Sequence, residues 1–239
     1  MKRFFYAGLT SLAAVALFPA GARSEEWSFV LTPYVWLPSI DSSLSVGSNP
    51  PAEDSGSILD YLDGAFLING EARRGAWSVL GEFNYLDFSD TLGTTPMGSV
   101  AEWRIEGVMA SLGAAYAFYD QSEVRIEALA GLRGWSVDTT SRVLRQQANV
   151  SSTWIDPIIG LRFNAPLSKQ VDISGMANVG GFGVGSELLW DAVAAINWSV
   201  SDLVTLSGGY RHLYLDFTDS STAIDLTLSG PFVALGFKF

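Results

Sequence analysis

The single histidine of the chain, His212, is the first place to look for catalytic chemistry. Asp216 follows four residues later, so in a β-strand both side chains would lie on the same side. A carboxylate that orients a histidine base suits a hydrolase at a protein surface, which is one hypothesis for this chain. No nucleophile or second acid pair accompanies these two residues. We therefore predict no catalytic residue and keep a surface hydrolase that uses His212 as an alternative.

Charged residues also recur at alternate positions within apolar segments. From 124 to 133, Arg125, Glu127 and Arg133 alternate with valine, isoleucine, alanine and leucine. This period of two is typical of a β-strand with one polar and one apolar face, and it recurs in the segments 66–73, 155–162, 171–179 and 191–200. The charged residues of the polar faces, whose signs nearly cancel, are Glu71, Arg73, Glu82, Arg125, Glu127, Arg133, Asp156, Arg162, Asp172, Asp191 and Arg211.

The sheet that positions these residues must have one polar and one apolar side. A soluble β-sandwich also alternates, but its apolar side is a packed core of Val, Ile, Leu and Phe, whereas many Ala and Gly occur here. An all-β, antiparallel, up-and-down transmembrane β-barrel fits better, with the apolar side toward lipid. A charge facing lipid near the middle of the membrane would cost roughly 2–4 kcal/mol. We therefore predict that Arg133 and Arg162 face the lumen and join an ionic core with acids such as Glu127 and Asp156.

Turn signals divide the chain into about ten strands. The predicted ranges are 26–37, 64–73, 77–88, 103–118, 123–137, 152–163, 170–180, 186–199, 203–216 and 222–239. Most connections alternate between tight turns and long loops, and the long ones are 38–63, 89–102 and 138–151. Bacterial barrels have short periplasmic turns and longer external loops, and an even strand number returns both mature termini to the periplasm. The segment 40–47 either extends the first strand or adds another, which leaves eight or twelve strands as alternatives.

The N-terminus resembles an export signal. Lys2 and Arg3 precede an apolar run from Phe4 to Leu17, and small residues follow up to Ala22. This pattern is typical of a secretory signal peptide, and the run is too short to cross a bilayer, which takes about 20 residues. We predict a signal peptide over 1–22, with cleavage after Ser24 as the alternative, and a single barrel domain over 23–239 in the cell outer membrane.

Composition excludes several other classes of protein. Cysteine is absent, so the chain has no disulfide framework and no thiolate metal site. The net charge is −11, which argues against nucleic acid as a partner. Loop 38–63 contains five acidic residues without the spacing of a calcium motif, so we interpret it as a solvated acidic loop. We expect no cofactor and no metal.

Aromatic residues fall near the two ends of the predicted strands. Such residues form girdles at the two membrane interfaces of a barrel. The candidates near the predicted periplasmic ends are Trp27, Trp77, Tyr116, Tyr119, Phe163, Trp198 and Phe239. Those near the external ends are Trp36, Tyr85, Trp103, Trp135, Trp154, Trp190 and Tyr214.

The alternating terminal residues Val233, Leu235, Phe237 and Phe239 resemble the C-terminal strand of bacterial outer-membrane barrels. That resemblance implies recognition of the last aromatic residue by the barrel-assembly machinery. The stretches 32–38, 58–63 and 71–77 resemble a functionally uncharacterised group of proteobacterial barrel proteins, which implies a fold and a location but no chemistry. The stretch 210–212 does not match the pattern of the omptin proteases.

The charged lumen suggests three functions for such a barrel. The interior of a barrel of about ten strands is narrow, so a structural barrel filled by an ionic core is the main hypothesis. A narrow polar channel for passive solute diffusion, with the same charges setting selectivity, is the second. Binding or adhesion through external loops is the third. We expect a monomer that contacts outer-membrane lipid and lipopolysaccharide.

Overall fold

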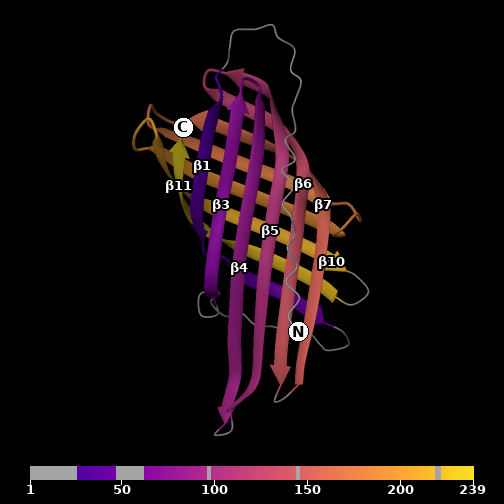
Figure 1. The fold of residues 1–239 in the computed structure, drawn as a ribbon. Helices are drawn as coiled ribbons and strands as arrows, with labels where there is room; N and C mark the ends of the chain where they lie inside the picture. Colours follow the sequence, from indigo (N-terminus) through magenta and orange to yellow (C-terminus); the bar gives the residue numbers. More distant parts are fainter. Residues whose placement is uncertain (1–25, 47–61, 96–97, 144–145, 219–221) are drawn as a thin grey trace.

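The computed structural model describes residues 26–46, 62–95, 98–143, 146–218 and 222–239. Eleven strands cover most of this part of the chain (Figure 1). They are β1 (Ser28–Trp36), β2 (Ser39–Val46), β3 (Leu62–Arg74), β4 (Trp77–Thr95), β5 (Gly98–Gln121), β6 (Val124–Val143), β7 (Gln146–Pro166), β8 (Val171–Gly181), β9 (Leu188–Ser199), β10 (Val204–Thr218) and β11 (Thr222–Lys238). The predicted signal peptide and most of loop 38–63 lie outside the described residues.

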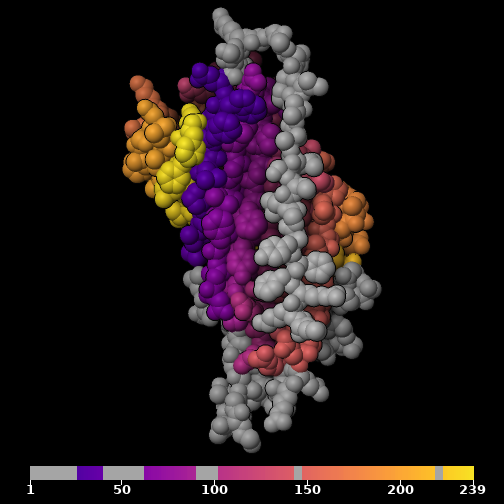
Figure 2. All heavy atoms as spheres, viewed as in Figure 1, coloured from indigo at the N-terminus to yellow at the C-terminus, as the bar shows by residue number. Residues whose placement is uncertain are grey.

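The strands form one closed antiparallel barrel. From β3 to β11, each strand pairs with its neighbours in sequence, and β1 pairs with both β3 and β11. The indigo β1 and the yellow β11 accordingly lie side by side on the surface (Figure 2). In the described part of the chain, no helix is long and apolar enough to cross a membrane.

The first strand of the barrel is interrupted, which explains why the sequence left open whether 40–47 extends it or forms another strand. β11 pairs with β1 through its residues 232–238 and with β2 through its residues 222–229. Leu37 and Pro38 separate β1 from β2, and proline cannot donate the ladder hydrogen bond of a continuous strand. β1 and β2 therefore act as one strand of a ten-strand barrel, which confirms the predicted fold and strand number.

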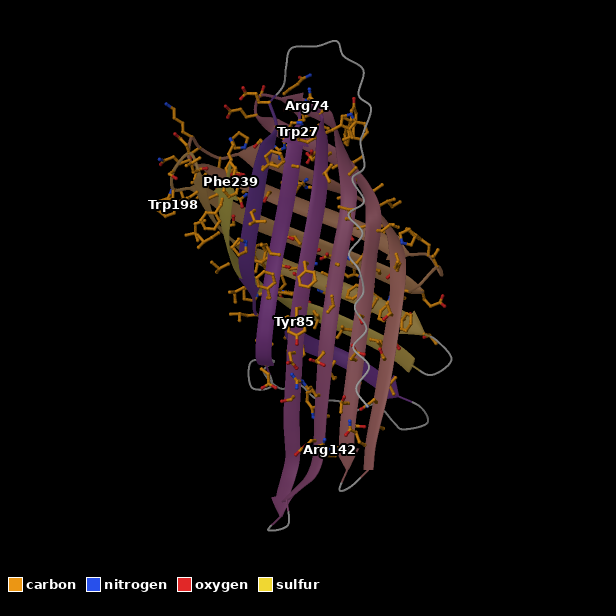
Figure 3. The ribbon with its side chains drawn as sticks, viewed as in Figure 1. Trp27, Arg74, Tyr85, Arg142, Trp198 and Phe239 are labelled. Carbon is orange, nitrogen blue, oxygen red and sulfur yellow. The ribbon has the colours of Figure 1, made fainter. Side chains whose placement is uncertain are left out.

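Alternate residues of each strand face the interior and the outside. Large apolar side chains are exposed on the outer surface, including Phe83, Leu112, Leu132, Ile155 and Val233. We call this band the apolar belt. At one end of it the strands are joined by short connections at 75–76, 122–123, 167–170 and 200–203, and we call this the short-turn end. Both Trp27 and Phe239 lie near the short-turn end, whereas Arg142 lies near the opposite end (Figure 3).

Four neighbouring strands, β4 to β7, extend far past the others at the end opposite the short turns (Figure 1). The predicted long loops 89–102 and 138–151 are therefore wrong: most of these residues continue the two hairpins. Their outward positions are polar, as in the ion pair between Arg142 and Glu102, so the apolar alternation that marked the other strands is lost. We call the projecting part of β4–β7 the wall.

Three tryptophans predicted for the external girdle point inward instead. Trp36, Trp135 and Trp154 are each buried, because their positions share a face with Tyr34, Arg133 and Asp156. The aromatic residues predicted for the other girdle include Trp77, Tyr116 and Trp198, and these are exposed on the outer surface at the short-turn end.

Candidate functional site

The centre of the barrel holds a compact group of charged side chains around Arg211. Its guanidinium donates to both carboxylate oxygens of Asp191, at 3.0 and 2.7 Å, and to Glu82 Oε1 at 2.6 Å. It also lies over the Trp36 ring, 5.0 Å from the ring centroid, in cation–π geometry. We call Tyr34, Glu82, Arg133, Asp191 and Arg211 the upper ionic cluster.

The remaining members of this cluster complete its hydrogen bonds. Arg133 Nη2 lies 3.1 Å from Asp191 Oδ2 and 3.5 Å from Glu82 Oε2. The Tyr34 hydroxyl accepts from Arg211 at 2.9 Å and donates to Asn84 Oδ1 at 2.7 Å. Asp191 is 0% exposed and Arg133 is 1% exposed. Two acids and two arginines thus balance in charge within a site that excludes solvent, which is the condition for burying such groups.

A second group of charges lies nearer the short-turn end. Arg162 pairs with Glu71 at 2.8 Å and with Glu127 at 3.3 Å. Arg73 also binds Glu71, at 2.6 Å, and Arg125 binds Glu127, at 3.0 Å. We call these five residues the lower ionic cluster. Nearby, Asp172 accepts hydrogen bonds from Asn164 and Asn197.

Asp156 lies inside the barrel but pairs with no arginine. Its carboxylate accepts from Trp135 Nε1 at 3.0 Å, from the Ser186 hydroxyl at 2.8 Å and from the Ser186 backbone N–H at 2.6 Å. Ser186 belongs to the β8–β9 connection, so Asp156 holds this connection against the barrel. All the charged residues predicted for the lumen thus lie on inward positions. Glu127 and Arg162, which lie opposite each other on β6 and β7, form an ion pair, whereas Arg133 lies opposite Asp156 but binds Asp191 instead.

An apolar layer closes the interior on the side of the wall. On β6, the next inward residue after Arg133 is Trp135, which is buried. On β10, the inward residues after Arg211 are Leu213, Leu215 and Phe217, which are also buried. Trp154 stacks between Trp135, at 5.9 Å between centroids, and Phe217, at 3.8 Å. We call the buried apolar side chains of this layer the apolar cap; they are Trp36, Leu67, Met109, Trp135, Trp154, Leu189, Leu213, Leu215, Phe217, Ile224 and Leu228.

A polar cavity of about 850 Å³ occupies the interior below the cap. Its lining extends from Lys169, Gln170 and Asp202 at the short-turn end to Tyr34 and Arg211 of the upper ionic cluster. The cavity therefore begins at the short turns and ends at that cluster. Among the described residues, no group of histidines and acids is arranged to hold a metal ion.

His212 lies outside this cavity. Its side chain is on the outer face of β10, because the inward residues of that strand are Arg211 and Leu213. The imidazole stacks on Trp190 at 4.3 Å between centroids, and Nδ1 lies 2.5 Å from Ser229 Oγ. Asp216 is not among its hydrogen-bond partners, so the pair considered for hydrolysis is not formed in this structure.

The predicted assembly residues Val233, Leu235, Phe237 and Phe239 are all exposed on the outer surface. The backbone of Phe239 exchanges two hydrogen bonds with Phe29, at 2.9 and 3.3 Å, and so fixes the end of β11 against β1.

Sequence reasoning missed two contributors to the interior, Tyr34 and Ser186, because their partners lie far away in the sequence. The period of two in 171–179 does predict that Asn178 faces the interior, and it is buried there.

Neither a family model nor a curated protein sequence matches this chain. Solved structures do match it. The outer-membrane protease OmpT of Escherichia coli aligns with a TM-score of 0.51 and 10% identity over 92% of this chain and 99% of that chain. The translocator domain of the autotransporter NalP of Neisseria meningitidis aligns with a TM-score of 0.44 and 10% identity, over 92% and 90%. Ail, the attachment invasion locus protein of Yersinia pestis, aligns with a TM-score of 0.40 and 12% identity, over 90% and 99%. The match to OmpT shows that this chain has the barrel fold of a Gram-negative outer-membrane protein.

Proposed function

We propose that this protein is a structural barrel of the outer membrane whose lumen does not conduct solutes. The apolar belt contacts lipid, the short-turn end faces the periplasm and the wall projects outside at the level of lipopolysaccharide. Short periplasmic turns and longer external hairpins are the usual asymmetry of bacterial barrels, and they support this orientation.

The apolar cap is the observation that carries the proposal of a closed lumen. A channel needs a continuous polar path between its two ends, whereas Trp135, Trp154 and Phe217 stack directly across the interior. The upper ionic cluster forms a second barrier below them, because its guanidinium and carboxylate groups bind one another rather than leave an open passage. Packing and ion pairing therefore fill the barrel in two successive layers.

Planar-bilayer recording of the refolded protein tests this function. Folding is checked in the same preparation by heat-modifiable migration on gels, and location by co-fractionation with outer membranes. We expect a folded barrel that gives no unitary current steps above the leak. Steady ion-selective steps from the folded protein would instead support the narrow channel, and a mature protein that remains soluble in the periplasm would contradict the membrane location.

We also propose that the outward residues Val233, Leu235, Phe237 and Phe239 are the signal read by the barrel-assembly machinery. Their exposure on one strand at the closing edge of the barrel supports this role, because the signal must be accessible before insertion.

A further inference from the structure

We propose that the polar cavity binds a small solute with an oxyanionic group, a carboxylate or a phosphate, which enters from the short-turn end. This inference goes beyond the structural role above, because the cavity ends below the apolar cap and a closed barrel can still hold a ligand.

The first reason is that several buried polar atoms of the cavity lining lack hydrogen-bond partners. Asn178 is 3% exposed, yet neither its amide nitrogen nor its amide oxygen has a hydrogen bond. Arg133 Nη1 is buried and likewise has no hydrogen bond. Leaving a buried polar group unpaired costs about 1–3 kcal/mol, and more for a charged group. Two such residues lining one cavity indicate that a bound molecule completes their hydrogen bonds.

These two residues are close together. Asn178 on β8 lies directly opposite Asp191 on β9, and Asp191 is the carboxylate that Arg133 binds at 3.1 Å. One solute at the inner end of the cavity can therefore accept from Arg133 Nη1 and also hydrogen-bond to the Asn178 amide.

The second reason is the charge of the lining, which favours an anion. The residues around the cavity include seven basic and five acidic side chains, in a chain whose net charge is −11. The deep acids are already bound by protein donors: Glu82 by Arg211, and Glu127 by Arg125 and Ser78. At the mouth, Lys169 and Lys238 form no ion pair with any residue that the structure describes. Most polar groups of the lining that can still form a hydrogen bond are therefore donors.

The third reason is size. A volume of about 850 Å³ lies within the range of roughly 300–1,000 Å³ that small-molecule sites occupy. It accommodates a small organic anion together with bridging waters, which are common in polar sites.

Asn178→Leu tests the proposal, with inorganic phosphate and succinate as probes. Leucine has the same number and branching of side-chain heavy atoms as asparagine but cannot hydrogen-bond to the anion. We expect either or both probes to raise the urea midpoint of the wild-type barrel in a saturable manner, since a ligand of the folded state stabilises it by mass action. In Asn178→Leu the affinity should fall roughly tenfold or more, as for the loss of a hydrogen bond to a charged group.

Three comparisons make this result specific. Asn149→Leu makes the same exchange on the outer face of the wall and should leave the affinity unchanged. Lys169→Gln with Lys238→Gln, at the exposed mouth, should weaken binding and reduce its dependence on salt. Glycerol at equal concentration, in chloride of matched ionic strength, should give no saturable shift. If Asn178→Leu does not fold, Asn178→Ala removes the same hydrogen bonds with a smaller side chain.

A shift with phosphate alone would assign a phosphate site, and a shift with succinate alone a carboxylate site. The proposal is overturned if neither probe gives a saturable shift, which would leave water as the only occupant, or if Asn178→Leu responds like the wild type. These outcomes do not depend on the conductance recordings, so failure of the anion site and failure of the closed lumen are distinguished.

Discussion

Asp191 illustrates how the barrel can contain charge in a place without solvent. Its two oxygens receive hydrogen bonds from Arg211 and Arg133, and both arginines also reach Glu82. Each charge in the upper ionic cluster therefore depends on at least two others. Removing one partner from such a group leaves an uncompensated charge, which is far more costly than losing one exposed ion pair.

We predict that Asp191→Asn destabilises the folded barrel by about 3–5 kcal/mol, because two buried guanidinium groups lose their shared counter-charge while the side-chain volume is unchanged. Urea unfolding in detergent measures the loss. Glu102→Gln is the matched control, because the 3.2 Å ion pair of Glu102 with Arg142 lies on the exposed face of the wall; it should cost no more than about 1 kcal/mol. Equal losses in the two variants would mean that the interior is well hydrated.

For single residues, the sequence predicts which face of the sheet a side chain lies on but not which residue it binds. The period of two is a local property, so Arg133, Asp156 and Arg162 could be assigned to the interior from their own strands. The contacts of Arg133 with Asp191 and of Arg211 with Tyr34 join residues separated by 58 and 177 positions. Those contacts depend on barrel closure, strand stagger and side-chain length, which no local pattern encodes.

Among the elements, the β8–β9 connection has the most specific attachment to the interior. Gly181, Phe182 and Gly183 have positive φ angles, and the chain then turns so that Ser186 is fully buried. The Ser186 hydroxyl accepts from Trp154 Nε1 at 2.9 Å and donates to Asp156. This connection therefore holds both the apolar cap and Asp156, an interior acid that no arginine binds.

We predict that Ser186→Ala lowers stability by about 1–3 kcal/mol, because it leaves the Trp154 N–H without its partner and removes a donor from Asp156. Faster hydrogen exchange in the β8–β9 connection should accompany this loss. Glu187→Gln changes the adjacent, exposed residue and should alter neither quantity. Unchanged exchange at the connection in Ser186→Ala would show that backbone contacts alone hold it.

Strand prediction succeeded where the outward face of the strand was apolar and failed where that face was polar. The wall shows the reason. Its outer face has ion pairs and hydrogen bonds such as those of Arg104 with Asp87 and of Ser136 with Thr153. Cross-strand polar pairs stabilise a sheet as well as apolar pairs do, but they give no hydrophobic period.

In the whole molecule, the interior changes in character from one end of the barrel to the other. The lower ionic cluster lies beside the cavity, the upper ionic cluster ends it, and the apolar cap follows. The two ends of the lumen therefore differ in the side chains that line them, although strand pairing continues all the way around the barrel.

The seam between β1 and β11 carries the last prediction. We predict that deleting Phe239 lowers the amount of barrel inserted in cells more than Phe239→Ala does, because deletion removes both the aromatic ring and the backbone hydrogen bonds to Phe29. Phe239→Ala removes the ring alone and should still reduce insertion if the ring is recognised. Heat-modifiable protein in outer-membrane fractions measures both. Leu203→Ala, an exposed residue of a short turn, should insert normally, and undiminished insertion of both Phe239 variants would contradict an assembly signal.

The same seam has a consequence for the order of folding. All pairings from β3 to β11 join consecutive strands, whereas β1 pairs with β11 through contacts such as Val30 with Lys238, near opposite ends of the described chain. Loop-closure entropy and contact order both place such a contact late, after the hairpins have formed. Until then, β1 and β11 are open edges able to pair with strands of another protein. A partner that held the open barrel would therefore have two free edges to bind until the backbones of Phe29 and Phe239 meet.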